Sequence, residues 1–252
     1  MKLSPAQLAE FKRDGVLTLP GFFAQTEVER WRRQVLAYFE HPSSGDDWRA
    51  ALRRRKADDF HPAPDPTPLD HPGLADLYGS LHGSTPWVGE NELLVRPGDE
   101  RAAWIGPRAP HIDYPIAVPV TTFANVIFYL TDVTERGAAF MYWPGSHHVA
   151  WRHHRRHPDD YLARGARSQD QTFTLLAKEM PCEPVEFTGR AGDLLLWHSF
   201  TFHSASINAR PETRLAIIGR WGEPRTGHAP WDFNADIWSA WRLRQTAPSE
   251  AS

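Results

Sequence analysis

The sequence predicts a mainly β protein with flanking helices, and we expect residues 1–252 to form one domain. Helical patterns lie mostly before residue 92, whereas short apolar runs rich in Val, Ile, Phe and Tyr follow it. All-β sandwiches of roughly 250 residues are often single domains. With 41% hydrophobic and 23% charged residues, the composition is globular and sufficient for a core.

Charge and cysteine content narrow the class of partner. The formal net charge of −3 gives no general attraction to nucleic acid, and no window approaches the ~18 uninterrupted apolar residues of a membrane span. The single cysteine permits no internal disulfide, and the chain begins without an apolar signal segment. We therefore expect a cytoplasmic protein with a small-molecule substrate, no nucleic-acid partner and no membrane. The sequence does not indicate an oligomeric state.

Residues 1–40 predict helical and strand support on the outside of a sheet. Ser4-Pro5 has the character of a helix start, and Gly15 ends that helix. A strand follows at residues 16–19. Thr26–Glu29 resembles a capping box that starts a helix extending to the end of this segment.

Residues 41–72 contain six prolines among charged residues and predict irregular structure. A short helix is expected within it at residues 47–56. Long loops of this kind often cover active sites, so we interpret the segment as a lid or loop insertion, with a solvated surface loop as the alternative. A helix at residues 74–79 and a strand at residues 92–96 are expected to follow.

The later segments predict strands and turns. Residues 122–131 are typical of a buried strand, in which Asn125 needs a partner, either a backbone group or a cosubstrate. A turn at residues 132–137 and a returning strand at residues 138–143 predict a hairpin. The histidine-rich residues 151–157 are interpreted as a solvent-facing loop, with metal binding as the alternative. Further expectations are a helical turn at 159–164, strands at 173–176 and 185–187, and a turn at 189–192.

A metal site is predicted at His111-Ile112-Asp113. Residues two apart on a strand share a face, so His111 and Asp113 point the same way. They are two of the three ligands of the 2-His-1-carboxylate triad, which binds Fe(II) and leaves three positions open. Such a triplet is common by chance, and surface hydrogen bonding is the alternative. A second histidine on a later strand is therefore required.

His198 and His203 are the candidates for that histidine, on a strand that follows Gly192. Arg214 favours His203, because 2-oxoglutarate needs a fixed cation and the planar fork of arginine binds a carboxylate at two points. The eleven residues from His203 to Arg214 leave room for a turn and a return strand. His198 is then expected to be a buried, hydrogen-bonded histidine.

These motifs, in this order, resemble the phytanoyl-CoA dioxygenase family of iron(II)/2-oxoglutarate-dependent oxygenases. The resemblance implies a double-stranded β-helix, a jelly-roll core of two sheets with helices packed on one side. The segments that carry it are residues 3–15, 19–23, 111–113, 130–139 and 144–147, Gly192-Asp193 with His203, Asn208 and Arg214.

The resemblance also implies the reaction. Fe(II) would be held by His111, Asp113 and His203, 2-oxoglutarate would be the cosubstrate on Arg214, and O₂ the oxidant. The products would be succinate, CO₂ and an oxidised small molecule, which we expect to be a natural-product or other secondary metabolite. The presence of Asp113 favours hydroxylation. Desaturation, epimerisation and ring formation are the alternatives.

Two positions depart from the family pattern. Many members have Gly-Ser after the distal histidine, whereas this chain has Ser204-Ala205-Ser206, so that Ser204, Ser206 or neither assists Arg214. The residue between the first two ligands is often Gln and is Ile112 here.

Three other function classes remain open. A cupin-like metalloenzyme without 2-oxoglutarate would not need Arg214, and a non-catalytic jelly-roll binding protein would not need all three ligands. A nucleic-acid demethylase should show a basic stripe near the metal, whereas the basic residues of this chain are interspersed with acids.

A substrate wall is predicted from four aromatic residues by their position near the ligands or Arg214. The alternative is that each fills the core, because aromatic side chains bury large areas. These residues are Trp104, Tyr114, Trp197 and Trp221.

Overall fold

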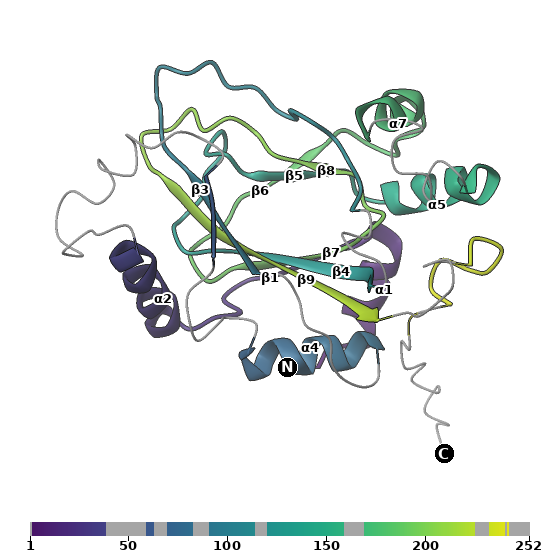
Figure 1. Ribbon diagram of the computed structural model, residues 1–252, viewed down its shortest axis with the longest axis horizontal. Helices are drawn as coiled ribbons and strands as arrows, with labels where there is room; N and C mark the ends of the chain where they lie inside the picture. The colour runs from purple at the N-terminus through teal and green to yellow at the C-terminus, as the bar shows by residue number, and fades with distance from the viewer. Residues whose placement is uncertain are drawn as a thin grey trace.

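Two antiparallel sheets face each other in the computed structural model, which describes residues 2–38, 59–62, 70–82, 91–113, 120–158, 169–224, 232–239 and 241 (Figure 1). The large sheet contains, in order, β1 (Val16–Leu19), β7 (Leu194–His198), β4 (Val120–Tyr129), β9 (Arg214–Pro224), β3 (Asn91–Arg96) and β2 (Asp59–Pro62). The small sheet contains β6 (Val185–Phe187), β5 (Phe140–Tyr142) and β8 (His203–Ser204).

The chain passes repeatedly between the sheets, with β4, β7 and β9 in the large one and β5 and β8 in the small one. This alternation is the arrangement of a double-stranded β-helix, so the predicted mainly β jelly roll is confirmed.

Helices cover the outer face of the large sheet and one end of the sandwich. Helices α1 (Pro5–Asp14), α2 (Gln25–Tyr38) and α4 (Pro72–His82) lie on the side of the large sheet away from the small one (Figure 1). Helices α5 (Ser146–Arg156) and α7 (Gln169–Leu176), with the short η2 (Ala177–Glu179), lie near β5 and β8. None of the helices in the described ranges has the length and apolarity that a membrane crossing requires.

Alternation along the strands gives the large sheet two different faces. Outward side chains such as Leu196 and Ile217 pack with Phe11, Trp31 and Leu77 of the helices. Inward side chains pack with Phe140 and Phe187 of the small sheet, and they include Val16, Leu94, Ile127, Tyr129, Leu195, Trp197, Ala216 and Ile218. An inward position therefore faces the space between the sheets, where the polar site described below is located.

The N-terminal elements agree with the sequence prediction, apart from one cap. Ser4 caps α1 by accepting from the Gln7 backbone N–H at 3.2 Å, and Gly15 ends the helix in the left-handed region at φ 70°. Helix α2 begins earlier than predicted, at Gln25, and the carboxylate of Glu27 accepts from the Ala24 backbone N–H. Thr26 is thus inside the helix, and the capping-box prediction was wrong by two residues.

The hairpin predicted for residues 122–143 does not form, because β4 and β5 belong to different sheets. After the turn, Arg136 and Ala138 adopt φ values of 63° and 58°, and the chain crosses to the small sheet. The strand expected to run from Gly192 to His203 is likewise divided. It breaks at residues 199–202 into β7 of the large sheet and β8 of the small sheet.

Two segments predicted as loop or strand are helical. Residues 151–157 belong largely to α5, in which His147, His153 and His154 are buried while Arg152 is exposed. Burial lowers the pKa of His147 to about 3, so this histidine packs as a neutral ring. The predicted strand at 173–176 forms the end of α7, which buries Thr172 and Leu176 at helical spacing.

The proposed lid at residues 41–72 lies largely outside the described residues, as does its predicted short helix. Two described parts of it are regular. Asp59–Pro62 forms the edge strand β2, paired with β3, and Pro72 is the first residue of α4, where a missing backbone N–H is tolerated.

The C-cap of α1 leads to a stability test. Gly15 and Gly21 both have positive φ, but a Cβ at Gly15 would meet His147 Nδ1 at 2.4 Å and Thr201 Oγ1 at 2.6 Å, whereas one at Gly21 would meet nothing within 4 Å. Gly21→Ala should lower the free energy of unfolding by roughly 1–2 kcal/mol through backbone strain alone. Gly15→Ala should lose about 1–3 kcal/mol more than Gly21→Ala, because the added Cβ overpacks the contact with His147 and Thr201. Denaturant unfolding measures both losses. Equal losses in the two variants would contradict the close contact at Gly15.

Candidate metal centre

The segment that carries His111 pairs with β8 through one isolated antiparallel bridge. His111 and His203 exchange two backbone hydrogen bonds of 2.9 Å, and the Asp113 N–H donates to the Ser199 carbonyl at 2.9 Å. The two ends of the triplet are thereby fixed to the residues that lead into and form β8. Ile112, between them, turns into the outer core as its alternation requires.

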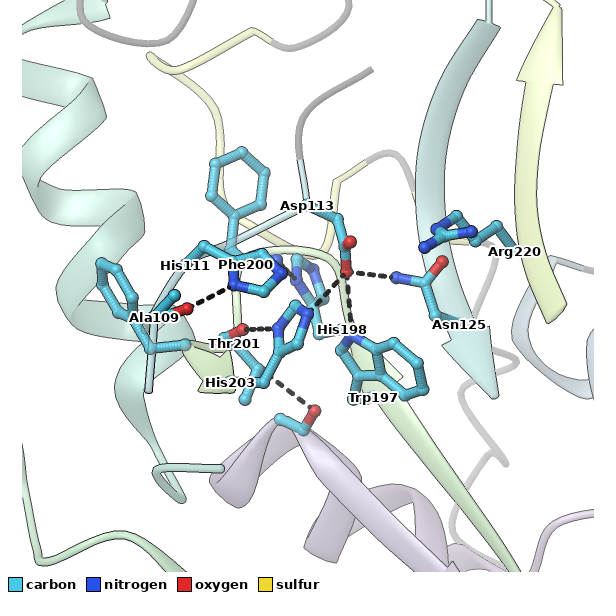
Figure 2. A network of polar contacts seen from close by, with 12 residues as sticks. Ala109, His111, Asp113, Asn125, Trp197, His198, Phe200, Thr201, His203 and Arg220 are labelled. Carbon is cyan, nitrogen blue, oxygen red and sulfur yellow. Dashed lines mark hydrogen bonds and ion pairs between the residues drawn. The ribbon is translucent and has the colours of Figure 1, made fainter. Parts of the chain in front are cut away.

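The structure brings the three predicted ligands together. One ligand atom from each of His111, Asp113 and His203 can be chosen so that all lie within 4.8 Å of one another. The Nδ1 of His111 contacts the Ala109 carbonyl at 2.7 Å, and the Nδ1 of His203 contacts the Thr201 carbonyl at 2.9 Å (Figure 2). A carbonyl only accepts, so each Nδ1 carries the hydrogen and each Nε2 keeps a lone pair for a metal.

Burial and neighbouring groups keep the side chains of His203 and Asp113 in their ligating states. Burial lowers the pKa of His203 to about 4, so its imidazole is neutral near pH 7. Burial acts to raise the pKa of Asp113, but electrostatic interactions with His203, Arg220 and His111 and a hydrogen bond from Trp197 outweigh it, and the pKa lies below its usual value. Two imidazoles and one carboxylate fit a divalent metal of the iron type.

The Asp113 carboxylate is held by two donors from the large sheet. Trp197 Nε1 donates to Asp113 Oδ2 at 2.9 Å, and Asn125 Nδ2 donates to the same oxygen at 2.7 Å (Figure 2). Trp197 and Asn125 are opposite each other in the register of β7 and β4. The amide N–H of Asn125 therefore contacts a predicted metal ligand, a partner that the sequence did not indicate, and the contact of Asn125 with the cosubstrate stays a prediction.

Arg214 is buried at the start of β9 and faces inward. It is 3% exposed, its Nη1 donates to the Ala138 carbonyl at 2.6 Å, and within the described residues its Nε has no hydrogen-bond partner. Burial lowers the pKa of Arg214 to about 10, which still leaves it charged near neutral pH. A buried guanidinium with an unused N–H is suited to receive a carboxylate.

The two candidate helper serines differ in their contacts. Ser204 Oγ accepts from the backbone N–H groups of Arg108 and Ala109 and so fixes the loop before His111. Ser206 Oγ donates to the Ala139 carbonyl at 3.0 Å, next to the carbonyl that Arg214 contacts. This arrangement favours Ser206 over Ser204 as the residue near Arg214.

The three predicted wall residues that the structure describes do not form one surface. Trp197 is inward and touches Asp113, whereas Trp221 is outward, in the outer core, with its ring 5.4 Å from that of Tyr78 on α4. Trp104 and Met141 both lie close to Gly106. Met141 is on the face of β5 opposite to Phe140, and Phe140 points inward. Tyr114 lies outside the described residues. The positions of Trp104 and Trp221 therefore do not support a substrate wall.

His198 is a buried, hydrogen-bonded histidine, in agreement with the prediction. Its Nδ1 accepts from the Phe200 backbone N–H at 3.0 Å, so in the neutral ring the Nε2 carries the hydrogen. Its ring stacks on Trp241, 5.0 Å away, on the outward side of the large sheet. The ring therefore offers no lone pair toward the three clustered ligands.

Two residues near the site were not singled out from the sequence. Arg220 lies opposite Asn125 in the register of β9 and β4, and its Nη1 is 2.8 Å from Glu92 Oε2. A signal was present for Arg220, because it is six residues after Arg214 and an even spacing on a strand gives the same face. Glu92 gave no such signal, because pairing between β3 and β9 is not visible in the sequence.

Comparison with known sequences identifies a family and a relative. A family model described as phytanoyl-CoA dioxygenase matches residues 11–216. The ectoine dioxygenase of Nocardia farcinica (strain IFM 10152) is 24% identical over 230 residues, which cover 84% of this chain and 75% of that protein.

Solved structures of natural-product enzymes share the fold. The non-heme α-ketoglutarate-dependent carbocyclase SnoK from nogalamycin biosynthesis matches with a TM-score of 0.63 and 21% identity, covering 88% of this chain and 84% of its own. The epimerase SnoN in complex with Fe³⁺, α-ketoglutarate and nogalamycin RO matches with a TM-score of 0.56 and 21% identity, covering 90% and 92%. These matches confirm the jelly-roll fold.

The hydrogen bonds to Asp113 lead to a prediction about metal affinity. Trp197→Phe keeps a large ring but removes the N–H that holds Oδ2, so it should weaken divalent-metal binding by about 10–100-fold, the usual effect of removing an outer partner of a ligand. Anaerobic metal titration with an equilibrium competitor measures the change. Trp221→Phe on the outward face is the matched control and should keep wild-type affinity. Equal affinities in wild type and Trp197→Phe would show that Asp113 is positioned without this bond.

Proposed function

Since the chain belongs to the phytanoyl-CoA dioxygenase family, we propose that it is an Fe(II)/2-oxoglutarate-dependent oxygenase that oxidises a small molecule. We assign Fe(II) to His111, Asp113 and His203, and 2-oxoglutarate to Arg214. Hydroxylation of a natural-product or other secondary metabolite is the reaction that we favour.

One observation carries this proposal. Three ligand atoms of the 2-His-1-carboxylate type lie within 4.8 Å of one another in the fold that also buries Arg214 on its inward face. A metalloenzyme without a keto-acid cosubstrate would have no use for a buried cation whose Nε has no partner among the described residues. A non-catalytic binding protein would need neither feature.

The residues have separate tasks in this reaction. Bound iron and 2-oxoglutarate supply the oxidising chemistry, in which O₂ is consumed and the cosubstrate becomes succinate and CO₂. His111, Asp113 and His203 would hold the metal through two imidazole nitrogens and one carboxylate oxygen. Asn125 and Trp197 keep the carboxylate ionised and oriented, and Arg214 fixes the far carboxylate of the cosubstrate by a charged hydrogen bond.

The presence of Asp113 supports hydroxylation, since its carboxylate takes the position that a halide would require. Proteins with this fold include a carbocyclase and an epimerase, so ring formation and epimerisation are the competing outcomes. Product analysis by mass spectrometry separates them, because hydroxylation adds one oxygen atom, epimerisation leaves the mass unchanged and ring closure removes two hydrogens.

The iron-binding proposal has a direct spectroscopic test. Anaerobic Fe(II) plus 2-oxoglutarate should give a weak visible charge-transfer band in the wild-type protein. His111→Ala, Asp113→Ala and His203→Ala should each lose bound iron, the band and turnover. His198→Ala should retain the band in its folded fraction, because its ring faces the outer core. Loss of iron in His198→Ala with iron retained in His203→Ala would overturn the assignment of the distal ligand.

The cosubstrate proposal is tested by Arg214→Lys. Lysine keeps the charge but loses the fork, so the KM for 2-oxoglutarate should rise by an amount on the order of the ~1.5–3 kcal/mol of a charged hydrogen bond. Iron content should barely change. Arg210→Lys, at an exposed arginine on the preceding turn, is the matched control. An unchanged KM in Arg214→Lys would remove the arginine from cosubstrate binding.

A further inference from the structure

Arg220 and Glu92 form an ion pair on the inward face of the large sheet. Arg220 Nη1 lies 2.8 Å from Glu92 Oε2, and the two side chains are 17% and 30% exposed. In the register of the sheet Arg220 is opposite Asn125, whose amide donates to Asp113. Figure 2 shows the guanidinium on the same side of the sheet as this carboxylate. The pair is therefore sheltered and adjacent to the metal site.

The two inward arginines of β9 are too far apart to hold one small cosubstrate. Arg214 and Arg220 are separated by six residues, which span roughly 20 Å at about 3.3 Å per residue of strand. The inward residues between them, Ala216 and Ile218, are apolar. A five-carbon keto acid covers well under half of this span. If Arg214 holds 2-oxoglutarate, that molecule does not extend to Arg220.

The predicted metal ligands are connected to Arg220 and to Arg214 by different sets of contacts. On one side, Asp113 is bonded to Asn125, the cross-strand neighbour of Arg220. On the other, Phe140 stacks on His203, and Ala138, two residues before Phe140, accepts from Arg214. The two arginines are therefore connected to the ligands through different contacts, and a molecule that binds at the metal beside Asn125 would lie next to Arg220.

Stability alone gives little reason for an ion pair at this position. Its inward neighbours Ile127 and Ile218 are apolar, and removing two charges from water is costly. Apolar side chains of similar volume would stabilise the sheet at least as well. Asp113, in turn, already receives hydrogen bonds from Trp197 and Asn125. The planar fork of an arginine is, however, well suited to bind an oxyanion at two points.

We infer that Arg220 binds an anionic group, specifically a carboxylate, on the molecule that the enzyme oxidises, and that this group competes with Glu92, which neutralises the guanidinium until the group arrives. The inference rests on the proposed function and narrows the substrate class to organic acids. It makes Arg220 a specificity-determining residue at the metal site.

Substitution of the two partners distinguishes this role from a structural one. Arg220→Gln removes the binding cation and should weaken the binding of an organic acid. Glu92→Gln removes a carboxylate that competes for the same cation and should strengthen it. A purely structural ion pair predicts losses of the same sign in both variants.

The experiment is a binding screen that does not require turnover. Metabolite carboxylates, each paired with its primary amide, are tested by saturation-transfer NMR on protein loaded with Zn(II), a redox-inert stand-in, and 2-oxoglutarate. In the wild type, acids should bind more tightly than their amides. Arg220→Gln should weaken acid binding by about tenfold or more, the range expected when a charged hydrogen bond is lost, and leave amide binding unchanged. Arg152→Gln, at an exposed arginine on α5, is the matched control.

The outcomes decide the inference separately from the proposed function. The inference is supported if the preference for acids disappears in Arg220→Gln, increases in Glu92→Gln and persists in Arg152→Gln. Any of three results overturns the inference. The acid preference persists in Arg220→Gln, acid binding weakens in both Arg220→Gln and Glu92→Gln, or the wild-type protein shows no acid preference in the panel. The proposed function fails in another way, by the absence of the Fe(II)·2-oxoglutarate band.

Folding is controlled with two further variants. Arg220→Gln leaves Glu92 without its cation, so circular dichroism and the Tm are measured for every variant. Arg220→Lys keeps the charge and should recover part of the acid preference. The double variant Glu92→Gln/Arg220→Gln buries no unpaired charge and should still bind acids no better than amides. An acid preference in that double variant counts against the inference.

Discussion

Asp113 connects the two sheets through its backbone and its side chain, and the arrangement of the site depends on it. Its backbone is bonded to Ser199 and its neighbour His111 pairs with β8, while its Oδ2 receives hydrogen bonds from Trp197 and Asn125 of the large sheet. A buried carboxylate is stable only where donors and positive charge compensate for lost water. Because both donors come from one cross-strand row, the register of β4 and β7 fixes where the ligand lies.

The inward face of the large sheet is divided along the strands into polar ends and an apolar centre. Arg214 and Arg96 are opposite each other at one end, and Arg220 follows toward the other. Between them lie Ala216 and Ile218, with Ile127 beside them. The apolar centre lowers the local dielectric, so the charged groups at each end interact strongly with whatever molecule comes to lie between the sheets. The same strand, β9, can in this way serve two ligands.

Local signals predicted much of the fold, and long-range pairing limited the rest. Ser4, Pro5 and Gly15 mark α1 because capping is a matter of a few adjacent residues. The ligand triplet was visible because two-residue spacing on an extended chain needs no knowledge of the partner. The hairpin expected at residues 122–143 was wrong because a turn sequence does not state which sheet the next strand joins. The loop expected at residues 151–157 was wrong because histidine was counted as polar, whereas the buried ring of His154 packs with Phe200 and Phe233.

Strand parity explains both the choice of His203 and the position of Trp221. On β7, Trp197 points inward to Asp113 while the next residue, His198, points outward to Trp241. On β9, Arg220 points inward while Trp221 points outward to Tyr78. Successive residues of a strand thus have different tasks, and a slip of one residue in register would exchange all of them. Counting outward from a single inward residue, such as Asn125 or Arg214, assigns each neighbour to the space between the sheets or to the helical layer. Proximity in sequence to a ligand or to Arg214 does not make this assignment. Trp221 was predicted in the substrate wall on that basis, although its ring belongs to the outer core.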